Sequence, residues 1–256
     1  MKMQAVYPLP LGVAAVGLLF GAPIAKAAPM VFFGEDQDAN QTVPADSEAV
    51  DAQEGFLDNL EGVRVEDFAD VDEGEVFPID IDFDGISATL DGTSDVGNTG
   101  VTSNNISGRF PVVGDKYLNV GTSDAAGFEL EFSEPQVAFG FFATDVGDFD
   151  GNLELTLDGE RNYVVDNTIG SFMTGALLFW GIVDEENPFQ TVSFENSDED
   201  WRDAFGFDGF TIGSEAQLVD RDPQAVPTPG TLTLLAAGLM GLAFTRLTRG
   251  ARRAPG

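Results

Sequence analysis

Carboxylates are the residues of this chain with the most obvious chemistry, and one group of them is spaced for a metal ion. Asp145, Asp148, Asp150 and Asn152 fall in a glycine-punctuated segment, DVGDFDGN, between two strongly apolar stretches. Calcium takes about six to eight oxygen ligands, and a loop of this kind can turn carboxylates and backbone carbonyls toward one point. The segment therefore predicts a calcium site, with a solvated acidic loop as the alternative.

A second candidate joins acids that lie far apart in the sequence. In jelly-roll binding modules the first and last strands often lie together, and carboxylates there hold a structural calcium ion. Glu66 and Asp67 stand near the start of the predicted strands, and Asp208 stands near their end. This second calcium site is a prediction from fold analogy alone.

The segment PIDIDFDGISATLD, residues 78–91, imitates an EF-hand loop, with aspartates at alternate positions before a glycine. An EF-hand needs flanking helices, whereas the flanks here alternate apolar and acidic residues with period two. Aspartates on one face of a strand are about 6.6 Å apart, which is too far for one tight site. The segment predicts a strand with Ile79, Ile81 and Phe83 turned inward.

Catalytic chemistry is restricted by two absences, since the sequence contains no Cys and no His. These absences exclude thiol nucleophiles, Cys or His zinc sites and a Ser–His–Asp triad. A glycan-cleaving enzyme would need only two carboxyl groups, but no spacing among the 44 acidic residues selects a pair. We therefore assign no catalytic residue. Four aromatic residues could stack on a sugar or fill the core instead, and these are Trp201, Phe205, Phe207 and Phe210.

The charge is unevenly distributed along the chain. The formal net charge is −32, and all the acidic residues lie between Ala28 and Pro229. Such a body repels nucleic acid and attracts cations. We therefore expect no nucleic-acid partner, and calcium is the one cofactor for which the composition is suited.

The first 27 residues have the organisation of a signal peptide. Lys2 precedes an apolar stretch over residues 11–24, and Ala25-Lys26-Ala27 forms an A-x-A cleavage site. We expect export and a mature chain that begins at Ala28. An uncleaved membrane anchor is the alternative.

The last residues, 223–256, predict a membrane-spanning segment. Sixteen residues from Gly230 to Thr245 carry no charge. As a helix, these sixteen residues extend about 24 Å, slightly less than the hydrocarbon core of about 30 Å. We predict that the helix covers residues 230–247. Arginines that follow a span stay in the cytoplasm, so the acidic body would lie outside. The arginines are Arg246, Arg249, Arg252 and Arg253. A buried helix is the alternative, but the segment has no polar face.

This tail resembles the PEP-CTERM sorting domain. The resemblance rests on Pro227-Thr228-Pro229, the apolar helix and the arginine cluster, in that order at the C-terminus. Thr228 stands where the family has Glu. The resemblance implies processing by an exosortase-like protease. The helix would tether an inner-membrane precursor, and the product would be released or attached at the cell surface.

The body between these segments predicts an all-β fold. Residues 28–62 form an acidic linker with a short helix, capped by Asp46 or Ser47 and ended by Gly62. Over residues 63–222, ten or eleven short strands with turn signals predict an antiparallel, jelly-roll-like β-sandwich. The dipeptides Asp91-Gly92 and Asp158-Gly159 predict turns, and residues 91–108 predict a long loop.

The body is also similar to a recurring group of PEP-CTERM cargo domains, over residues 31–213. The matching stretches are residues 32–36, 66–68, 143–149 and 205–208. This resemblance implies a non-catalytic surface or matrix protein, and we expect it to be associated with extracellular polysaccharide. The alternatives are a calcium-dependent carbohydrate-binding module and a glycan-cleaving enzyme.

Overall fold

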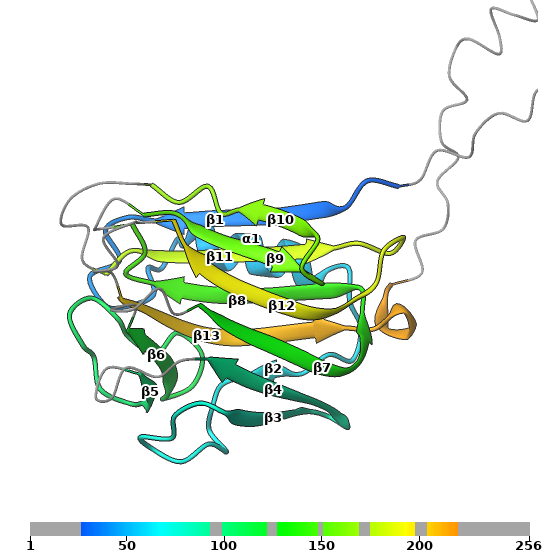
Figure 1. Cartoon of the computed structure of the whole chain (residues 1–256). Helices are drawn as coiled ribbons and strands as arrows, with labels where there is room; N and C mark the ends of the chain where they lie inside the picture. Colours follow the sequence, from blue (N-terminus) through cyan, green and yellow to red (C-terminus); the bar gives the residue numbers. More distant parts are fainter. Residues whose placement is uncertain are drawn as a thin grey trace, which may run out of the picture.

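The computed structural model describes residues 27–92, 99–121, 127–147, 151–168, 175–197 and 204–219. Within them, two antiparallel sheets pack against each other (Figure 1). The seven-stranded sheet has the order β1 (Met30–Asp36), β11 (Leu177–Val183), β8 (Ala138–Thr144), β13 (Ala204–Gly213), β6 (Tyr117–Gly121) and β5 (Gly100–Thr102), and β2 (Val65–Glu66) pairs with β13. The six-stranded sheet has the order β10 (Arg161–Val164), β9 (Leu153–Leu157), β12 (Phe189–Asn196), β7 (Phe128–Gln136), β4 (Ile86–Gly92) and β3 (Ile79–Phe83). The predicted antiparallel β-sandwich is confirmed.

Phenylalanine rings fill the space between the two sheets. The rings of Phe128 and Phe194, on adjacent strands, stack with centroids 4.3 Å apart. Phe141, from the opposite sheet, meets Phe194 edge-on at 5.2 Å. Aromatic pairs in these geometries add to the stabilisation that burial of apolar area supplies. The alternation predicted for β3 is confirmed, because Ile79, Ile81 and Phe83 are buried while the aspartates between them are exposed.

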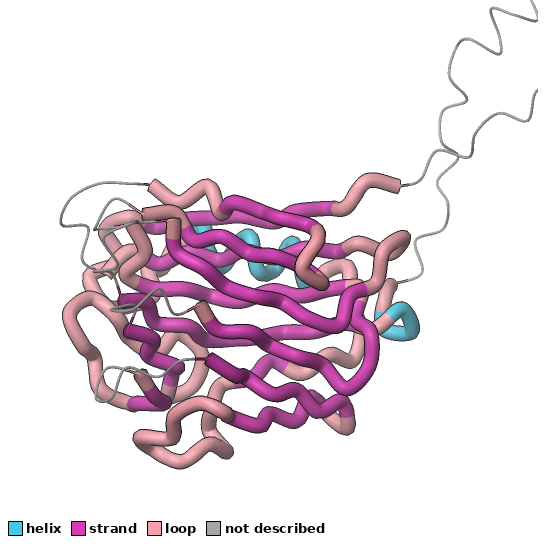
Figure 2. Tube along the Cα trace, viewed as in Figure 1, coloured by secondary structure: helices cyan, strands magenta, loops and turns pink. Residues whose placement is uncertain are grey.

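A helix covers the outer face of the seven-stranded sheet. Helix α1 (Glu48–Leu57) packs on β1 and β11, and Figure 2 shows it behind the strands. Its Phe56 ring lies over Gly140 and Gly181, and a Cβ at Gly181 would lie 2.9 Å from the ring. The strands β8 and β11 are therefore buried on both faces, which explains their continuous apolar sequences.

The helix begins and ends at side-chain caps. Ser47 is the N-cap, as predicted, and its Oγ accepts a hydrogen bond from the Val50 N–H at 3.1 Å. The helix ends at Leu57, so the prediction that Gly62 ends it is wrong. The reason is Asn59, whose Nδ2 donates to the carbonyls of Gly55 and Phe56 and satisfies them earlier.

Two tight turns set the register of the six-stranded sheet. Asp158 and Gly159 join β9 to β10 with positive φ angles of 50° and 66°, which confirms that hairpin. Asp84 and Gly85 join β3 to β4 in the same way. The turn predicted at 91–92 is wrong, since both residues pair with β7 inside β4.

Two segments differ from the expected loops and linkers. The strand β1 lies within residues 28–62, where only a linker and a helix are predicted, and it pairs with β11. The strand β5 lies within residues 91–108, which were expected to form a loop throughout. The structure also describes one short 3-10 helix, η1 (Glu215–Gln217), after the last strand.

Candidate functional site

The outer face of the six-stranded sheet carries no covering element among the described residues. Because side chains alternate along each strand, this face presents every second residue, and most are acidic or hydroxylated. We call this surface the acidic face. Its residues are Asp80, Asp82, Ser87, Thr89, Asp91, Glu129, Glu131, Ser133, Glu154, Thr156, Asn162, Val164, Thr191, Ser193 and Glu195. None of them is aromatic, so this part of the surface is suited to hydrogen bonding and charge interactions.

The acidic face contains a hollow of about 170 Å³. Its walls come from β4, β7 and β12. The lining residues are Ser87, Thr89, Glu131, Phe132, Ser133 and Gln190. The hollow lies where the pairing of β7 with β12 shifts, since Thr191 pairs with Glu131 but Phe189 pairs with Gln136. The extra residues of β7 include Pro135, which cannot donate to the ladder and is typical of such bulges. The bulge therefore shapes the hollow.

The side chains of the hollow present oxygen atoms to solvent. Glu131 is exposed, and its carboxylate makes no hydrogen bond or ion pair with any residue that the structure describes. The Ser133 Oγ accepts a hydrogen bond from the Ser87 N–H at 3.1 Å, and hydroxyls of this kind can both donate and accept. A carboxylate beside hydroxyls is a set of groups that can bind a polyhydroxylated or cationic ligand.

Asp158 fixes the β12 side of the hollow. Its Oδ1 accepts hydrogen bonds from the N–H groups of Gln190, at 2.8 Å, and Thr191, at 3.0 Å. The Gln190 Nε2 in turn donates to the Phe132 carbonyl at 2.9 Å. The sequence shows Asp158 as a turn residue only, so this positioning role was not predicted. Neither Ser87 nor Gln190 was predicted as a site residue, because the hollow arises from long-range strand register.

The first predicted calcium site is described only in part. Asp145 is buried at 3 % exposure, and its Oδ1 accepts a hydrogen bond from the Gly175 N–H at 3.1 Å. Asn152 is half-buried, and its backbone N–H donates to the Ser197 Oγ. Asp148 and Asp150 lie outside the described residues. Calcium binding by this loop stays a prediction.

The structure brings the second predicted group together. Glu66 pairs with Phe210 where β2 joins β13, two residues from Asp208. The carboxylates are already engaged, however. Glu66 accepts from the Phe68 N–H at 2.7 Å and lies 3.5 Å from the Arg64 guanidinium. Asp67 accepts from the Ala69 N–H at 3.0 Å. Within the described ranges, these acids form no group of three that could hold a metal ion.

Asp208 connects β13 to a neighbouring loop. Its Oδ2 accepts hydrogen bonds from the N–H groups of Val112 and Val113, each at 2.7 Å, and its Oδ1 accepts one from Gly209. Burial raises the pKa of Asp208 to about 7, because loss of hydration outweighs these three donors, and the charge of Asp67 adds to the rise. Burial also raises the pKa of Glu66.

A raised carboxyl pKa can mark a catalytic acid, but this position does not fit that role. Asp208 is 1 % exposed and Glu66 is 2 % exposed, and backbone N–H groups donate to both carboxylates. A substrate has no route to either carboxyl group. We interpret them as structural acids that hold the strand β2 and the loop around Val112 against β13.

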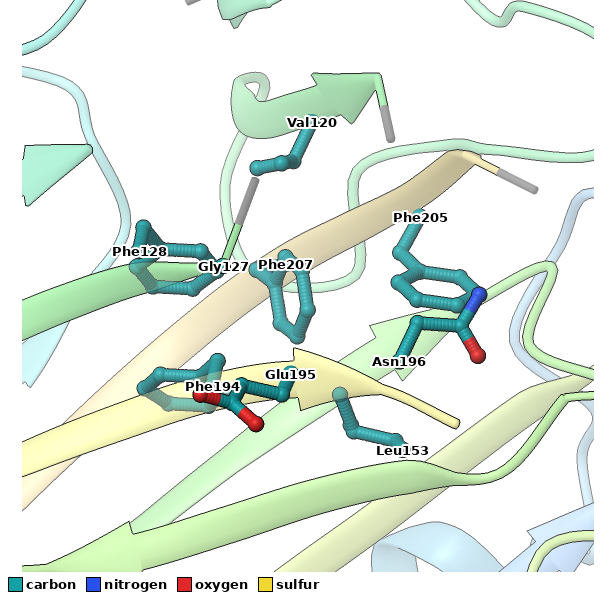
Figure 3. A pocket seen from close by; sticks show the side chains of 9 residues that line it. All are labelled: Val120, Gly127, Phe128, Leu153, Phe194, Glu195, Asn196, Phe205 and Phe207. Carbon is teal, nitrogen blue, oxygen red and sulfur yellow. The ribbon is translucent and has the colours of Figure 1, made fainter. Parts of the chain in front are cut away.

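The predicted aromatic platform belongs to the core. Phe205, Phe207 and Phe210 are buried at 2 %, 1 % and 0 % exposure, and Trp201 lies outside the described residues. Figure 3 shows Phe205 and Phe207 beside an opening between the sheets. This opening has a volume of only about 10 Å³, which is room for about one water molecule. It is too small for a sugar ring.

The two predicted targeting segments lie almost wholly outside the described residues. Ala25 falls in the undescribed range 1–26, while Ala27 and Ala28 are exposed. The sorting motif Pro227-Thr228-Pro229 and its arginines fall in the undescribed range 220–256. In the part of the chain that the structure describes, no helix has the length and apolar character needed to span a membrane.

Comparison with known proteins gives distant structural similarities. No family model and no curated protein matches this chain. The K2 cleaved adhesin domain of Lys-gingipain is similar at 11% identity, over 59% of this chain and 97% of that domain, with a TM-score of 0.39. TmCBM61 in complex with β-1,4-galactotriose is similar at 14% identity, over 49% and 88% of the two chains, with a TM-score of 0.26. The CBM22-1 xylan-binding domain from Paenibacillus barcinonensis Xyn10C is similar at 16% identity, over 51% and 86%, with a TM-score of 0.31.

Proposed function

We propose that this chain is an exported, non-catalytic β-sandwich that holds extracellular polysaccharide on its acidic face. The observation that carries the proposal is the hollow between β4, β7 and β12. Its hydroxyls and the carboxylate of Glu131 are groups that hydrogen-bond to sugar hydroxyls. Helix α1 covers the opposite sheet, and among the described residues no element covers the acidic face.

We infer further that the sandwich is a jelly roll. The support is the strand order of β6 to β13. These eight strands contribute the order β11-β8-β13-β6 to one sheet and β10-β9-β12-β7 to the other. The chain crosses between the sheets at every step except the β9–β10 hairpin, and such eight-stranded winding is typical of jelly rolls. In this interpretation β1, β3, β4 and β5 are additions at the sheet edges.

Substitution in the hollow tests polysaccharide binding. Ser87→Phe places a ring in the hollow, so a glycan array and calorimetry with the purified chain should show at least about tenfold weaker binding. Asn162→Phe adds the same ring on β10, on the same face but outside the hollow, and should bind like the parent. Equal binding by both variants would contradict the assignment of the hollow.

The same assay tests the alternative in which glycan binding depends on calcium. If the loop with Asp145, Asp148, Asp150 and Asn152 holds a calcium ion, removal of calcium with a chelator should weaken glycan binding. The double variant Asp148→Asn, Asp150→Asn should then bind glycan as the chelated parent does. Calcium titration by calorimetry compares the parent with the variant. The same heat for both would rule out this loop as a calcium site.

Export and sorting are proposed on the two terminal segments. An exosortase-like protease would cleave near Pro227-Thr228-Pro229, after the helix predicted at 230–247 has tethered the precursor. Intact-mass measurement of the extracellular product should give a chain that begins at Ala28 and lacks residues 230–256. An extracellular product that retains these residues would contradict processing.

A further inference from the structure

We propose that the polysaccharide bound by the acidic face is cationic, with sugar units that carry free amino groups. This inference rests on the proposed function and names the ligand class for the same surface. Seven acids lie on the acidic face, namely Asp80, Asp82, Asp91, Glu129, Glu131, Glu154 and Glu195. The strands of this sheet contain one basic residue, Arg161.

Arg161 does not neutralise the acidic face. Its guanidinium lies 2.8 Å from the buried carboxylate of Asp184 and 3.5 Å from Asp158, and it also lies over the ring of Phe189. These contacts hold it at the β9–β10 turn and on the connection between β11 and β12. The carboxylates of the acidic face therefore have no basic partner on the strands that carry them.

The strand register places like charges directly opposite one another. Asp91 on β4 pairs with Glu129 on β7, and Glu154 on β9 pairs with Glu195 on β12. Directly opposite residues have Cβ atoms about 4.5–5.5 Å apart, and like charges in such pairs destabilise a sheet. A cation between two carboxylates removes this repulsion. The arrangement therefore favours a ligand that brings positive charge to several strands at once.

The uncharged residues of the acidic face favour a sugar over other cationic ligands. Uncharged glycans commonly stack their rings on exposed aromatic side chains, and the acidic face has none. Anionic glycans would be repelled. Serine and threonine hydroxyls lie between the acids, at Ser87, Thr89, Thr156 and Ser193. Thr89, Thr156 and Ser193 donate to Asp80, Asn162 and Glu129, and their oxygens can still accept hydrogen bonds from sugar hydroxyls. Amino sugars offer both the charge and the hydroxyls.

A matched pair of oligosaccharides tests the inference. The probes are β-1,4-linked oligomers of glucosamine and of N-acetylglucosamine of the same length, which differ in the charged amine. Calorimetry with the purified full chain at about pH 5.5 keeps amines protonated, while carboxyl side chains ionise at about pH 4 in model peptides. We expect the glucosamine oligomer to bind at least about tenfold more tightly, and its affinity to fall steeply between about 0.05 M and 0.5 M salt.

Two charge variants locate the binding. Glu131→Gln removes the carboxylate of the hollow and should weaken glucosamine binding about twofold to fivefold. Glu185→Gln removes the same charge from the turn between β11 and β12, outside the acidic face, and should leave binding close to that of the parent. Equal losses in both variants would overturn the assignment to this face, since attraction to the overall charge would then explain binding.

The outcomes separate this inference from the proposed function. Equal affinity for both oligomers, or affinity independent of salt, overturns the cationic ligand class and leaves polysaccharide binding intact. Failure of both oligomers also overturns it. The proposed function falls with it only if every glycan of the array fails as well.

Discussion

Asp208 makes the stability of this protein depend on pH. Burial raises its pKa from the ordinary aspartate value of 3.8 to about 7. At a pH between these two values, the carboxyl group is protonated in the folded state and ionised in the unfolded state. The free energy of unfolding therefore falls as the pH rises through this range. Keeping the charge buried at pH 8 costs up to about 4 kcal/mol by this linkage. Glu66, whose pKa burial also raises, acts in the same direction.

Thermal unfolding of the parent and of Asp208→Asn checks this prediction. The parent should gain stability when the pH is lowered from about 8 to about 5, and Asp208→Asn should gain clearly less, because it has no proton to take up at this position. The difference between the two pH slopes is the quantity to measure, since repulsion among the other acids is common to both proteins. Identical slopes would show that Asp208 does not titrate in this range.

Single residues of the site were predictable only where local sequence decides. The period-two alternation of β3 was sufficient to place its aspartates on the surface. Analogy with jelly rolls was sufficient to predict that Glu66 and Asp208 lie close together. The sequence does not indicate which backbone N–H groups donate hydrogen bonds to these two carboxylates. The role of Asp158 at β12 depends on a contact across more than thirty residues, and nothing in the sequence near Asp158 indicates it.

At the scale of elements, β1 and α1 depend on one carboxylate. Asp36, the last residue of β1, accepts hydrogen bonds from the Ser47 Oγ at 2.5 Å and from the N–H groups of Glu48 and Ala49. A carboxylate at a helix N-terminus satisfies unpaired donors and interacts favourably with the helix dipole. Asp36 therefore joins the edge strand to the helix that covers its sheet.

Asp36→Ala should destabilise the fold by about 1–2 kcal/mol. Asp38 lies two residues after Asp36 and is exposed. Asp38→Ala should therefore change stability by less than about 0.5 kcal/mol. Urea denaturation followed by circular dichroism measures both. A loss in Asp38→Ala as large as that in Asp36→Ala would assign the effect to net charge and not to the cap.

Elements with strong periodicity were predictable, and elements defined by distant partners were not. The apolar stretch of β8 and the Asp158-Gly159 hairpin have local signals, and both are confirmed. The two Asp-Gly dipeptides near β4 carry the same local signal, yet only Asp84-Gly85 forms a turn, because pairing with β7 extends β4 through Gly92. Among the described strands, β1 pairs with β11 alone, which lies about 150 residues away.

At the scale of the whole molecule, the excess of carboxylates opposes folding. The net charge of −32 makes the compact state repel itself, and salt screens that repulsion. The melting temperature should rise when sodium chloride is raised from about 0.05 M to 1 M at neutral pH. The same salt step at about pH 4, where many carboxyl groups are protonated, should have a smaller effect. A melting temperature that stays constant or falls at neutral pH would contradict this account.

The one-sided placement of α1 gives the sandwich two unlike exteriors. Neighbouring copies crowded on a common surface would repel one another most strongly where their bare carboxylate sides approach, so those sides would stay apart. Helix α1 also exposes Glu48, Asp51 and Glu54 and contains no basic residue, so the helix-covered sides would repel one another as well. A dense layer of this protein would therefore keep solvent-filled gaps lined with negative charge, and mobile counter-ions would collect in them.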